Sequence, residues 1–354
     1  MPANVFTTSQ AVGNREDLIN RIFRTSPTDT PFVSRIDRVN AEAVWHEWQR
    51  DTLRAPNPNN SAPEGADATF AKQQPTERLG NRCQIFTDTF SISGTQDAVS
   101  RAGGPEMARL KAKKALEIKK DIEAACISNP VQRIEDATGN RKLRGLNGWI
   151  ATNNNLGAGG VAPDPANNIA PVDGTKRDYT EDLLKDAVLQ AYQNGGDVRF
   201  AIMAPYLKQV ASGFEGNVVR NQDVNGVARV TLNTAYTFYG SDFGIIEMVP
   251  NRTMSNGIDD NVYGIDPDYW AVATLRAFET EELAKTGDNT SFLMVAELTL
   301  QAGEERSSFA IRDLNATAPA GGTTLAASRN ADVNRTNADT NGNNGNGNGS
   351  NNRV

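Results

Sequence analysis

Two strand-like segments separated by a long polar stretch constrain this chain most. Residues 41–54 (AEAVWHEWQRDTLR) and 82–95 (RCQIFTDTFSISGT) are rich in the β-branched and aromatic residues that favour strands. The stretch between them is studded with proline, asparagine and glycine, which predicts a long hairpin with a large irregular tip. Trp45 and Trp48 point to opposite faces of the first strand, so both faces need cover. An isolated two-stranded hairpin is marginal in water, and the pattern therefore indicates obligate assembly.

The strongest helix signal covers residues 106–127 (EMARLKAKKALEIKKDIEAACI). Pro105 stands near the first turn, where its missing N–H does no harm, and Pro130 lies just beyond the end. One face carries the apolar residues Met107, Leu110, Ile118, Ile122 and Ala125, with Lys114 as an interruption. At 1.5 Å per residue this helix would be about 33 Å long, enough to span a domain.

The charge of this region has two interpretations. Residues 101–144 contain 11 Lys and Arg against 6 Asp and Glu, although the whole chain carries a formal net charge of −7. The helix could present a solvated face with the ion pairs Lys113–Glu117 and Lys119–Glu123. It could instead meet nucleic-acid phosphates. The sequence pI of about 5.0 excludes a protein that depends on nonspecific nucleic-acid affinity over its whole surface.

The remaining chain alternates between helices, strands and loops. Helices are predicted at 14–24, 180–194 and 205–214, and an irregular loop at 151–178. Strands are predicted at 198–204, 227–232, 235–239, 243–249 and 262–265. Residues 270–280 and 291–301 are expected to form a hairpin, with 307–314 as a candidate third strand. Residues 341–352 are only Asn, Gly and Ser, which predicts flexibility for the tail.

Common catalytic and metal-binding arrangements are not supported. His46 is the single histidine, and with Cys83 and Cys126 it cannot complete a four-ligand zinc site. Two cysteines provide no disulfide framework, so a reducing cytoplasm is the default compartment. No G-x-S-x-G or G-x-x-x-x-G-K-[ST] motif occurs, and no apolar run approaches the roughly 20 residues of a membrane helix. We therefore expect no metal and no cofactor, and only carboxylates, lysines and tyrosines remain as catalytic candidates.

Three partial motifs favour structural interpretations. The His46-Glu47 pair lacks the second histidine of a zincin, so His46 is interpreted as a packed interface residue, with a pH-sensing role as the alternative. The glycines around Gly157 lack the flanking strand and helix of a dinucleotide site. An acidic cluster is predicted to be a solvated turn, with a weak ion site as the alternative; it comprises Asp259, Asp260, Asp266 and Asp268.

Several short segments, in order and spacing, are similar to those of one protein family. They are Ser26–Phe32 (SPTDTPF), His46–Gln49 (HEWQ) with Asp51 and Leu53, Glu64–Asp67 (EGAD), Ser93–Gln96 (SGTQ), Asp121–Glu123 (DIE), Gly145-Leu146 with Trp149-Ile150, Asp242–Gly244 (DFG) and Leu283–Asp288 (LAKTGD). Over about residues 15–315 the chain resembles the major capsid proteins of tailed bacteriophages, in the SU-ten-like subfamily with the Hong Kong 97-type fold.

The resemblance implies an α+β fold with named parts. These are an N-terminal arm (1–40), an extended loop formed by a β-hairpin (41–95), a peripheral domain (96–179) with a spine helix (106–127) and a variable loop, an axial domain (180–265), return strands of the peripheral domain (266–315) and a flexible tail (316–354). It also implies self-assembly into hexamers and pentamers of an icosahedral head around double-stranded DNA, in the virion, after assembly in the host cytoplasm.

The resemblance also supplies expected contacts. The extended loop would contact neighbouring subunits through Trp45, His46, Trp48, Phe86 and Phe90. The spine helix would face the lumen and its DNA through Lys111, Lys113, Lys114, Lys119 and Lys120. Expected partners are further copies of the chain, packaged DNA, and portal and scaffolding or decoration proteins, with no membrane. The alternatives are a monomeric β-rich binding or adhesin module and a carboxylate-based hydrolase.

Overall fold

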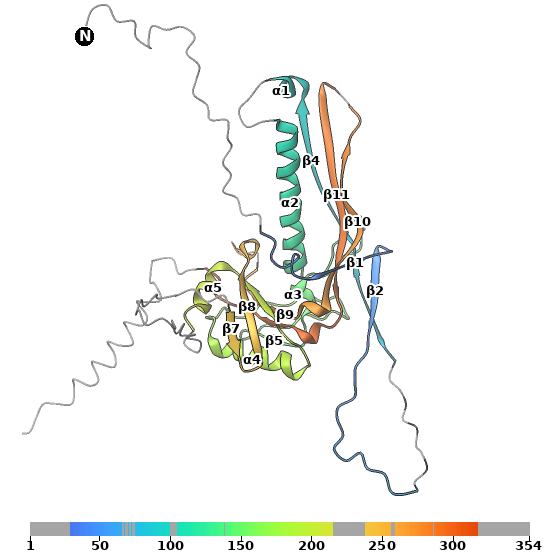
Figure 1. Ribbon diagram of the computed structural model, residues 1–354, viewed down its shortest axis with the longest axis vertical. Helices are drawn as coiled ribbons and strands as arrows, with labels where there is room; N and C mark the ends of the chain where they lie inside the picture. The colour runs from blue at the N-terminus through green and yellow to red at the C-terminus, as the bar shows by residue number, and fades with distance from the viewer. Residues whose placement is uncertain are drawn as a thin grey trace, which may run out of the picture. The chain divides into compact units, whose positions relative to one another are not determined.

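Two β-sheets, a long helix and a separate hairpin organise the chain in the computed structural model (Figure 1). The structure describes residues 29–65, 67, 70, 72, 75–99, 105–137, 139–214, 238–255, 259–285 and 287–317. The described residues from Asp29 to Ala316 belong to one compact unit. The helix predicted at 14–24, the strand at 227–232, most of the strand at 235–239 and nearly all of the tail lie outside the described residues.

The first sheet has four strands in the order β1-β10-β11-β4. Their bounds are Asp37–Asn40 for β1, Gln84–Ser93 for β4, Trp270–Glu282 for β10 and Asn289–Ala302 for β11. β10 and β11 form the hairpin predicted from the sequence, and the parallel strand β1 lies on the other edge of β10. The stacked rings of Phe90 and Phe292, with centroids 5.2 Å apart, join β4 to β11 across this sheet.

Helix α2 (Glu106–Ser128) confirms the predicted long helix and runs beside β4 and β11 (Figure 1). Its periodic apolar face is buried around Ile118 and Ile122, so the amphipathic pattern packs the helix on the sheet. The Lys113–Glu117 pair is present, with 3.6 Å between charged atoms. The predicted Lys119–Glu123 pair is wrong, because the Glu123 side chain turns inward and accepts hydrogen bonds from other elements.

The second sheet has six strands in the order β5-β12-β9-β6-β8-β7. Their bounds are Asn154–Asn155 for β5, Phe200–Met203 for β6, Phe238–Ser241 for β7, Gly244–Pro250 for β8, Val262–Ile265 for β9 and Phe309–Ile311 for β12. Helices α4 (Glu181–Gln193) and α5 (Pro205–Ala211) match predicted helices, and α4 packs against β12 and β5. β12 is therefore not a third strand of the β10–β11 hairpin. Its fully buried Phe309, Ala310 and Ile311 belong to the six-stranded sheet and to the main core, which both sheets share.

Short helical segments connect these elements. They are α1 (Gly94–Ala98), α3 (Leu146–Trp149), η1 (Arg252–Met254), η2 (Pro267–Tyr269) and η3 (Glu305–Ser307). The six-stranded sheet takes two strands, β5 and β12, from outside residues 180–265. The predicted axial segment therefore shares its core with chain on both sides of it.

The predicted hairpin has a different second strand. β2 (Trp45–Arg50) pairs antiparallel with β3 (Glu77–Arg82), so Arg82 is the only residue of the predicted strand 82–95 that takes part in this pairing. At Cys83 the chain leaves this pair, and β4 continues along β11 from Gln84 to Ser93. The cause is the apolar alternation of β4, because Phe86, Phe90 and Ile92 are buried only where β4 joins the sheet beside α2.

Candidate assembly interface

One face of β2 packs on its own subunit. His46 Nε2 lies 3.0 Å from Gln301 Oε1 at the end of β11. Trp48 packs against the core, and Arg50 forms ion pairs with Glu77 (2.8 Å) and Glu304 (3.3 Å). These alternate residues share the inward face of the strand. His46 and Trp48, two of the expected intersubunit anchors, are therefore half-buried and already make contacts within their own subunit.

Trp45 lies on the opposite face of the hairpin, half-buried. Its indole sits over Gly80 of the paired strand, where an added Cβ would lie 2.6 Å from Trp45 Cζ2. The guanidinium of Arg82 stacks on the ring, with its carbon 4.8 Å from the ring centroid. Any larger residue at position 80 would collide with the indole ring, so the close approach of the ring requires glycine there. The result is an aromatic surface held in one orientation on the outward face of the hairpin.

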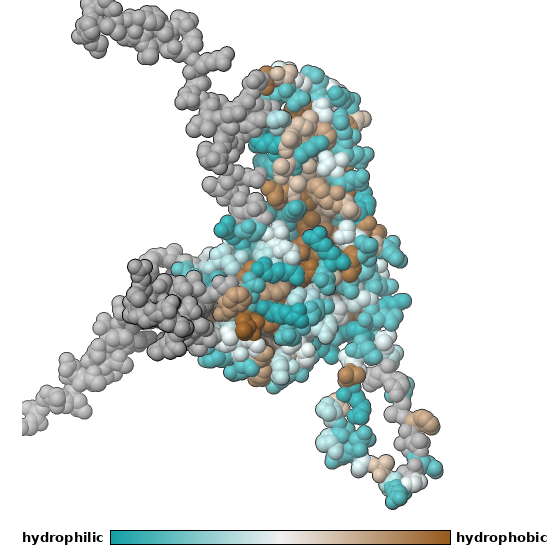
Figure 2. All heavy atoms as spheres, in the orientation of Figure 1, coloured by the Kyte–Doolittle hydropathy of each residue, from teal (hydrophilic) through white to brown (hydrophobic). Residues whose placement is uncertain are grey.

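The loop between β2 and β3 carries apolar side chains with no cover. Residues 51–65 are all exposed, and the loop projects away from both sheets (Figure 1). Leu53 and Phe70 are 98% and 97% exposed. In Figure 2 the projecting loop is mostly hydrophilic with isolated hydrophobic side chains. Leu53 and Phe70 are not among the contacts expected from the sequence, although two large apolar residues within a polar loop indicate a contact surface.

Phe86 and Phe90 require a correction. Both side chains are buried within the subunit, beneath α2, and Phe90 stacks on Phe292. They lie on β4, which belongs to the four-stranded sheet and not to the hairpin. Buried side chains leave no surface for a neighbouring subunit, so these two phenylalanines are core residues.

The five lysines of α2 are not equivalent. Lys111 Nζ lies 4.1 Å from the ring centroid of Phe292, and Lys114 pairs with Asp88 (3.1 Å) and Glu117 (3.0 Å). Lys113 and Lys119 are exposed, whereas Lys120 is half-buried. Lys113 and Lys119 are therefore the most solvent-exposed of the five. Lys111 and Lys114 instead contact the sheet and hold the helix against it.

The acidic cluster is divided: Asp268 is exposed and Asp260 half-exposed, as expected of a solvated turn, whereas the other two carboxylates are buried. Asp259 is only 5% exposed, and Asp266 is also buried. Asp259 accepts hydrogen bonds from the Tyr263 hydroxyl (2.9 Å) and the Asn261 amide (3.0 Å). Burial raises the pKa of Asp259 to about 6, although the two hydrogen-bond donors stabilise the charged carboxylate and act to lower the pKa. Within the described ranges, no group of three or more His, Cys, Asp or Glu side chains could hold a metal ion.

The irregular loop at 151–178 is held by two carboxylates, and Glu305 binds its beginning through the amides of Ala151 and Thr152. Asp313 accepts hydrogen bonds from the amides of Gly157 (2.9 Å) and Gly174 (2.8 Å). The Gly157 amide is therefore occupied by an acceptor from a distant segment of the chain. None of the helices in the described part of the chain has the length and apolarity needed to cross a bilayer.

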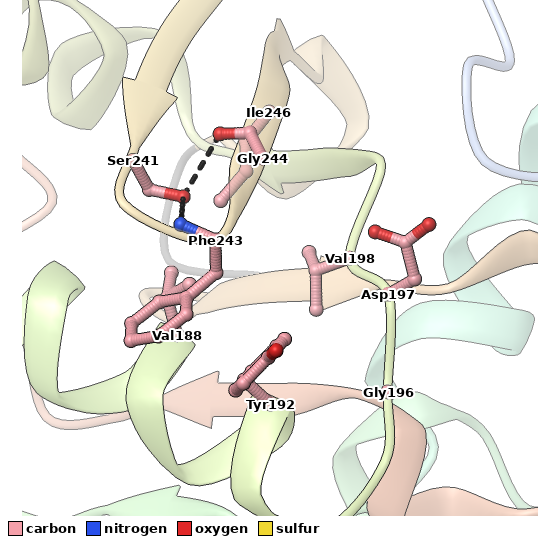
Figure 3. A pocket seen from close by; sticks show the side chains of 9 residues that line it. All are labelled: Val188, Tyr192, Gly196, Asp197, Val198, Ser241, Phe243, Gly244 and Ile246. Carbon is pink, nitrogen blue, oxygen red and sulfur yellow. Dashed lines mark hydrogen bonds between the residues drawn. The ribbon is translucent and has the colours of Figure 1, made fainter.

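A small cavity lies between α4 and the β7–β8 turn (Figure 3). Tyr192 and Phe243 stack across it with centroids 4.5 Å apart, and the Ser241 hydroxyl donates to the Gly244 carbonyl (2.9 Å) and accepts from the Phe243 amide. Its volume of about 10 Å³ is room for about one water molecule. Small-molecule sites are typically about 300–1,000 Å³, so this cavity is not one.

Comparison with known proteins gives a consistent result. The family model for the SU10 major capsid protein matches residues 3–315. The major capsid protein of Escherichia phage Phieco32 is 25% identical over 340 residues, which cover 84% of this chain and 93% of that protein.

Solved structures are similar at the level of fold. The Cyanophage A-1(L) capsid asymmetric unit matches with a TM-score of 0.59 and 14% identity, over 87% of this chain and 98% of that one. A structure from Mycobacterium phage Adephagia matches with a TM-score of 0.56 and 12% identity, over 90% and 100% of the two chains. The holo-SrpI encapsulin complex from Synechococcus elongatus has a TM-score of 0.50 at 8% identity, over 88% and 96%. The predicted α+β fold of the Hong Kong 97 type is confirmed.

Proposed function

The chain belongs to the SU10 major capsid protein family, and from this premise we propose that its copies form the hexamers and pentamers of an icosahedral head that encloses double-stranded DNA. It is a structural component of the phage capsid and not an enzyme. The proposal concerns how the subunits join. We assign the principal contact to the hairpin β2–β3 and the loop between its strands.

The observation that carries this proposal is the exposure of Leu53 and Phe70. Both are almost fully exposed in the isolated subunit. Covering a side chain of this size stabilises a complex by roughly 1.5–3 kcal/mol. A neighbouring copy that covers both residues gains this contribution, and the same contact repeats at every subunit of a shell.

The outward face of the hairpin supports the same assignment. Trp45 is held between Gly80 and Arg82 before any partner arrives, so little side-chain freedom remains to be lost on binding. Truncation of a tryptophan at an interface often costs about 2 kcal/mol or more. We therefore propose Trp45 as the aromatic anchor of the contact between subunits. Trp48 is not part of this proposed contact.

The roles of the other segments are part of the proposal. Residues 1–40 would form the N-terminal arm, α2 the spine helix, and residues 180–265 most of the axial domain. Lys113 and Lys119 would face the lumen, where exposed ammonium groups can neutralise packaged phosphate. Portal and scaffolding or decoration proteins would join the same shell.

A pair of double variants tests the hairpin assignment. Leu53→Ser with Phe70→Ser removes the exposed apolar groups of the loop. Ile169→Ser with Val172→Ser removes exposed apolar groups from another loop and serves as the matched control. Gradient sedimentation and electron microscopy should show folded but unassembled protein for the first variant, and shells for the control. Normal shell yield from the hairpin variant would contradict the proposal.

A further inference from the structure

Asn81 is a fully buried amide side chain on β3, with 0% exposure. Its Nδ2 donates to the backbone carbonyls of Arg144 (2.9 Å) and Leu300 (2.8 Å). Its Oδ1 accepts from the backbone amides of Arg144 (2.9 Å) and Arg82 (2.9 Å). An asparagine side chain has two N–H donors and an oxygen with two lone pairs, so these bonds use its whole hydrogen-bonding capacity.

The four bonds join three separate parts of the chain. Leu300 lies near the end of β11, and Arg144 lies just before α3. Arg82 is the last residue of β3, and from Cys83 onward the chain leaves the hairpin to become β4. Asn81 therefore stands at the corner where the hairpin β2–β3 is attached to the rest of its subunit.

The other contacts on the inward face of the hairpin constrain its angle less. His46, the cross-strand partner of Asn81, is hydrogen-bonded to β11 through one ring nitrogen. Trp48 and Leu79 are partly buried and pack on the core, and apolar contacts have no preferred direction. The ion pair from Arg50 to the loop after β11 is partly exposed, where such pairs contribute little. Hydrogen bonds weaken steeply when they are bent, so Asn81 supplies most of the directional constraint.

The site requires an amide side chain. Without Asn81, the N–H and C=O groups of Arg144 and the C=O group of Leu300 would lose their partner in a buried place, which is costly. A carboxylate cannot donate to the two carbonyls, and an aliphatic side chain can neither donate nor accept. The bonds form together only when the hairpin lies at one angle to β11 and to the segment before α3.

We propose that Asn81 is a positioning residue that fixes the angle of the hairpin β2–β3 on its own subunit, so that the outward face with Trp45 has a set direction before a second copy of the chain binds. The inference rests on the proposed function in one respect, since the angle matters for assembly only if the hairpin is the contact between subunits. A preset angle reduces the freedom that is lost on binding. The attachment itself is a property of the single subunit and can be measured without a shell.

Hydrogen exchange of the full-length protein tests the attachment. Asn81→Leu keeps the branched shape and nearly the size of the side chain but removes all four hydrogen bonds. An isolated two-stranded hairpin is marginal in water, so a loosened hairpin should open more often. We expect exchange across residues 45–50 and 77–82 to become at least about tenfold faster, as expected for the loss of buried hydrogen bonds. Residues 262–265 of β9 should exchange as before.

Asn153→Leu is the matched control. Asn153 is another buried amide, 1% exposed, and it likewise donates to two backbone carbonyls, those of Arg306 (2.6 Å) and Ser308 (2.9 Å). It lies next to β5, in the six-stranded sheet, so the same chemical change is made away from the hairpin. Exchange across the hairpin should be the same in Asn153→Leu as in the wild-type protein.

A pair of spin labels measures the angle directly. Gln49→Cys places one label on the outward face of β2, and Lys119→Cys places the other on an exposed position of α2. The native Cys83 and Cys126 are fully buried and should remain unlabelled. Dilution with unlabelled protein leaves only the distance within one subunit. We expect one narrow distance with Asn81 present, and loss of that distance to a broad distribution in Asn81→Leu.

Three results would overturn the proposal. The first is wild-type protein in which β2 and β3 exchange as fast as the exposed loop at 51–65, a result that does not require any variant to fold. The second is unchanged hairpin exchange or a retained narrow distance in Asn81→Leu. The third is equal acceleration in β9, or in the hairpin of Asn153→Leu, which would mean a general loss of stability.

Sedimentation separates this proposal from the proposed function. Wild-type protein that forms no shells counts against the proposed function alone, because the exchange and distance results stand without assembly. A loosened hairpin in Asn81→Leu together with a normal yield of shells would contradict the role of the angle in assembly. The expected result is a folded Asn81→Leu subunit with a reduced yield of shells.

Discussion

The indole ring of Trp48 lies against that of Trp149, with centroids 5.4 Å apart and planes inclined at 49°. Trp149 belongs to the short helix α3 and is buried in the main core. The two hairpin tryptophans therefore have different environments, although they are three residues apart. Trp48 joins the hairpin to its own subunit, whereas Trp45 lies on the outward face above Gly80.

Single alanine substitutions should separate these two roles. Trp48→Ala removes a core contact and should lower the free energy of unfolding by about 3 kcal/mol. Trp45→Ala should leave that free energy nearly unchanged and shift the protein from shells toward free capsomers or monomers. Urea unfolding followed by circular dichroism measures the first effect, and gradient sedimentation measures the second. Equal loss of stability in both variants would refute the assignment of Trp45 to the contact between subunits.

The buried Asp259 should make stability depend on pH. Its pKa is about 6 in the folded protein and 3.8 in a model peptide, so the folded state binds the proton more tightly than the unfolded chain. The free energy of unfolding should therefore fall as pH rises through this range, by up to about 3 kcal/mol. Asp259→Asn should remove this decrease, because the side chain stays neutral and the Tyr263 hydroxyl can still pair with it. Urea titrations between pH 4 and pH 7 provide the measurement. Identical pH profiles of the wild-type protein and Asp259→Asn would contradict the prediction.

Mature shells should contain no covalent crosslink between subunits. Lys72 is the only lysine between Ala55 and Asn81, in the loop of the hairpin. An isopeptide bond needs an amine, an acceptor side chain and a carboxylate to carry the proton, all in register. A denaturing gel of purified particles should show one band at 38.2 kDa. A ladder of multiples of that mass that disappears in Lys72→Arg would show that a crosslink forms there.

The exposed lysines of α2 should be sheltered in DNA-filled heads. Lys113 and Lys119 are expected to face the lumen, so an amine-reactive reagent too large to enter should label them at least about tenfold less in intact particles than in dissociated subunits. Mass spectrometry of the labelled peptides measures this ratio, and the dissociated protein is the internal control. Equal labelling in both samples would place the lysines on the outer surface.

Elements with strong local patterns could be predicted closely. The helix predicted at 106–127 differs from α2 by one residue at its C-terminal end. The prediction used the apolar periodicity and the flanking prolines, and it succeeds because helix formation depends on neighbours three and four positions away. The hairpin of β10 and β11 is likewise visible in two strand-like runs around a turn. The opposite orientations of Trp45 and Trp48 follow from strand geometry alone.

The amino-acid sequence by itself determined the principal elements, the resemblance to phage capsid proteins and the two-faced hairpin. Only the tertiary structure decided that β4 pairs with β11, that Phe86 and Phe90 are core residues, that Trp48 packs against the core, and that Glu123 and Asp259 are buried. The physical reason is the range of the interactions. A helix or strand is specified by residues close in sequence, whereas the partner of a strand and the donors of a buried carboxylate come from distant segments. The amides that Glu123 binds lie 91 and 90 residues away, so no local pattern around it could distinguish it from a solvated charge.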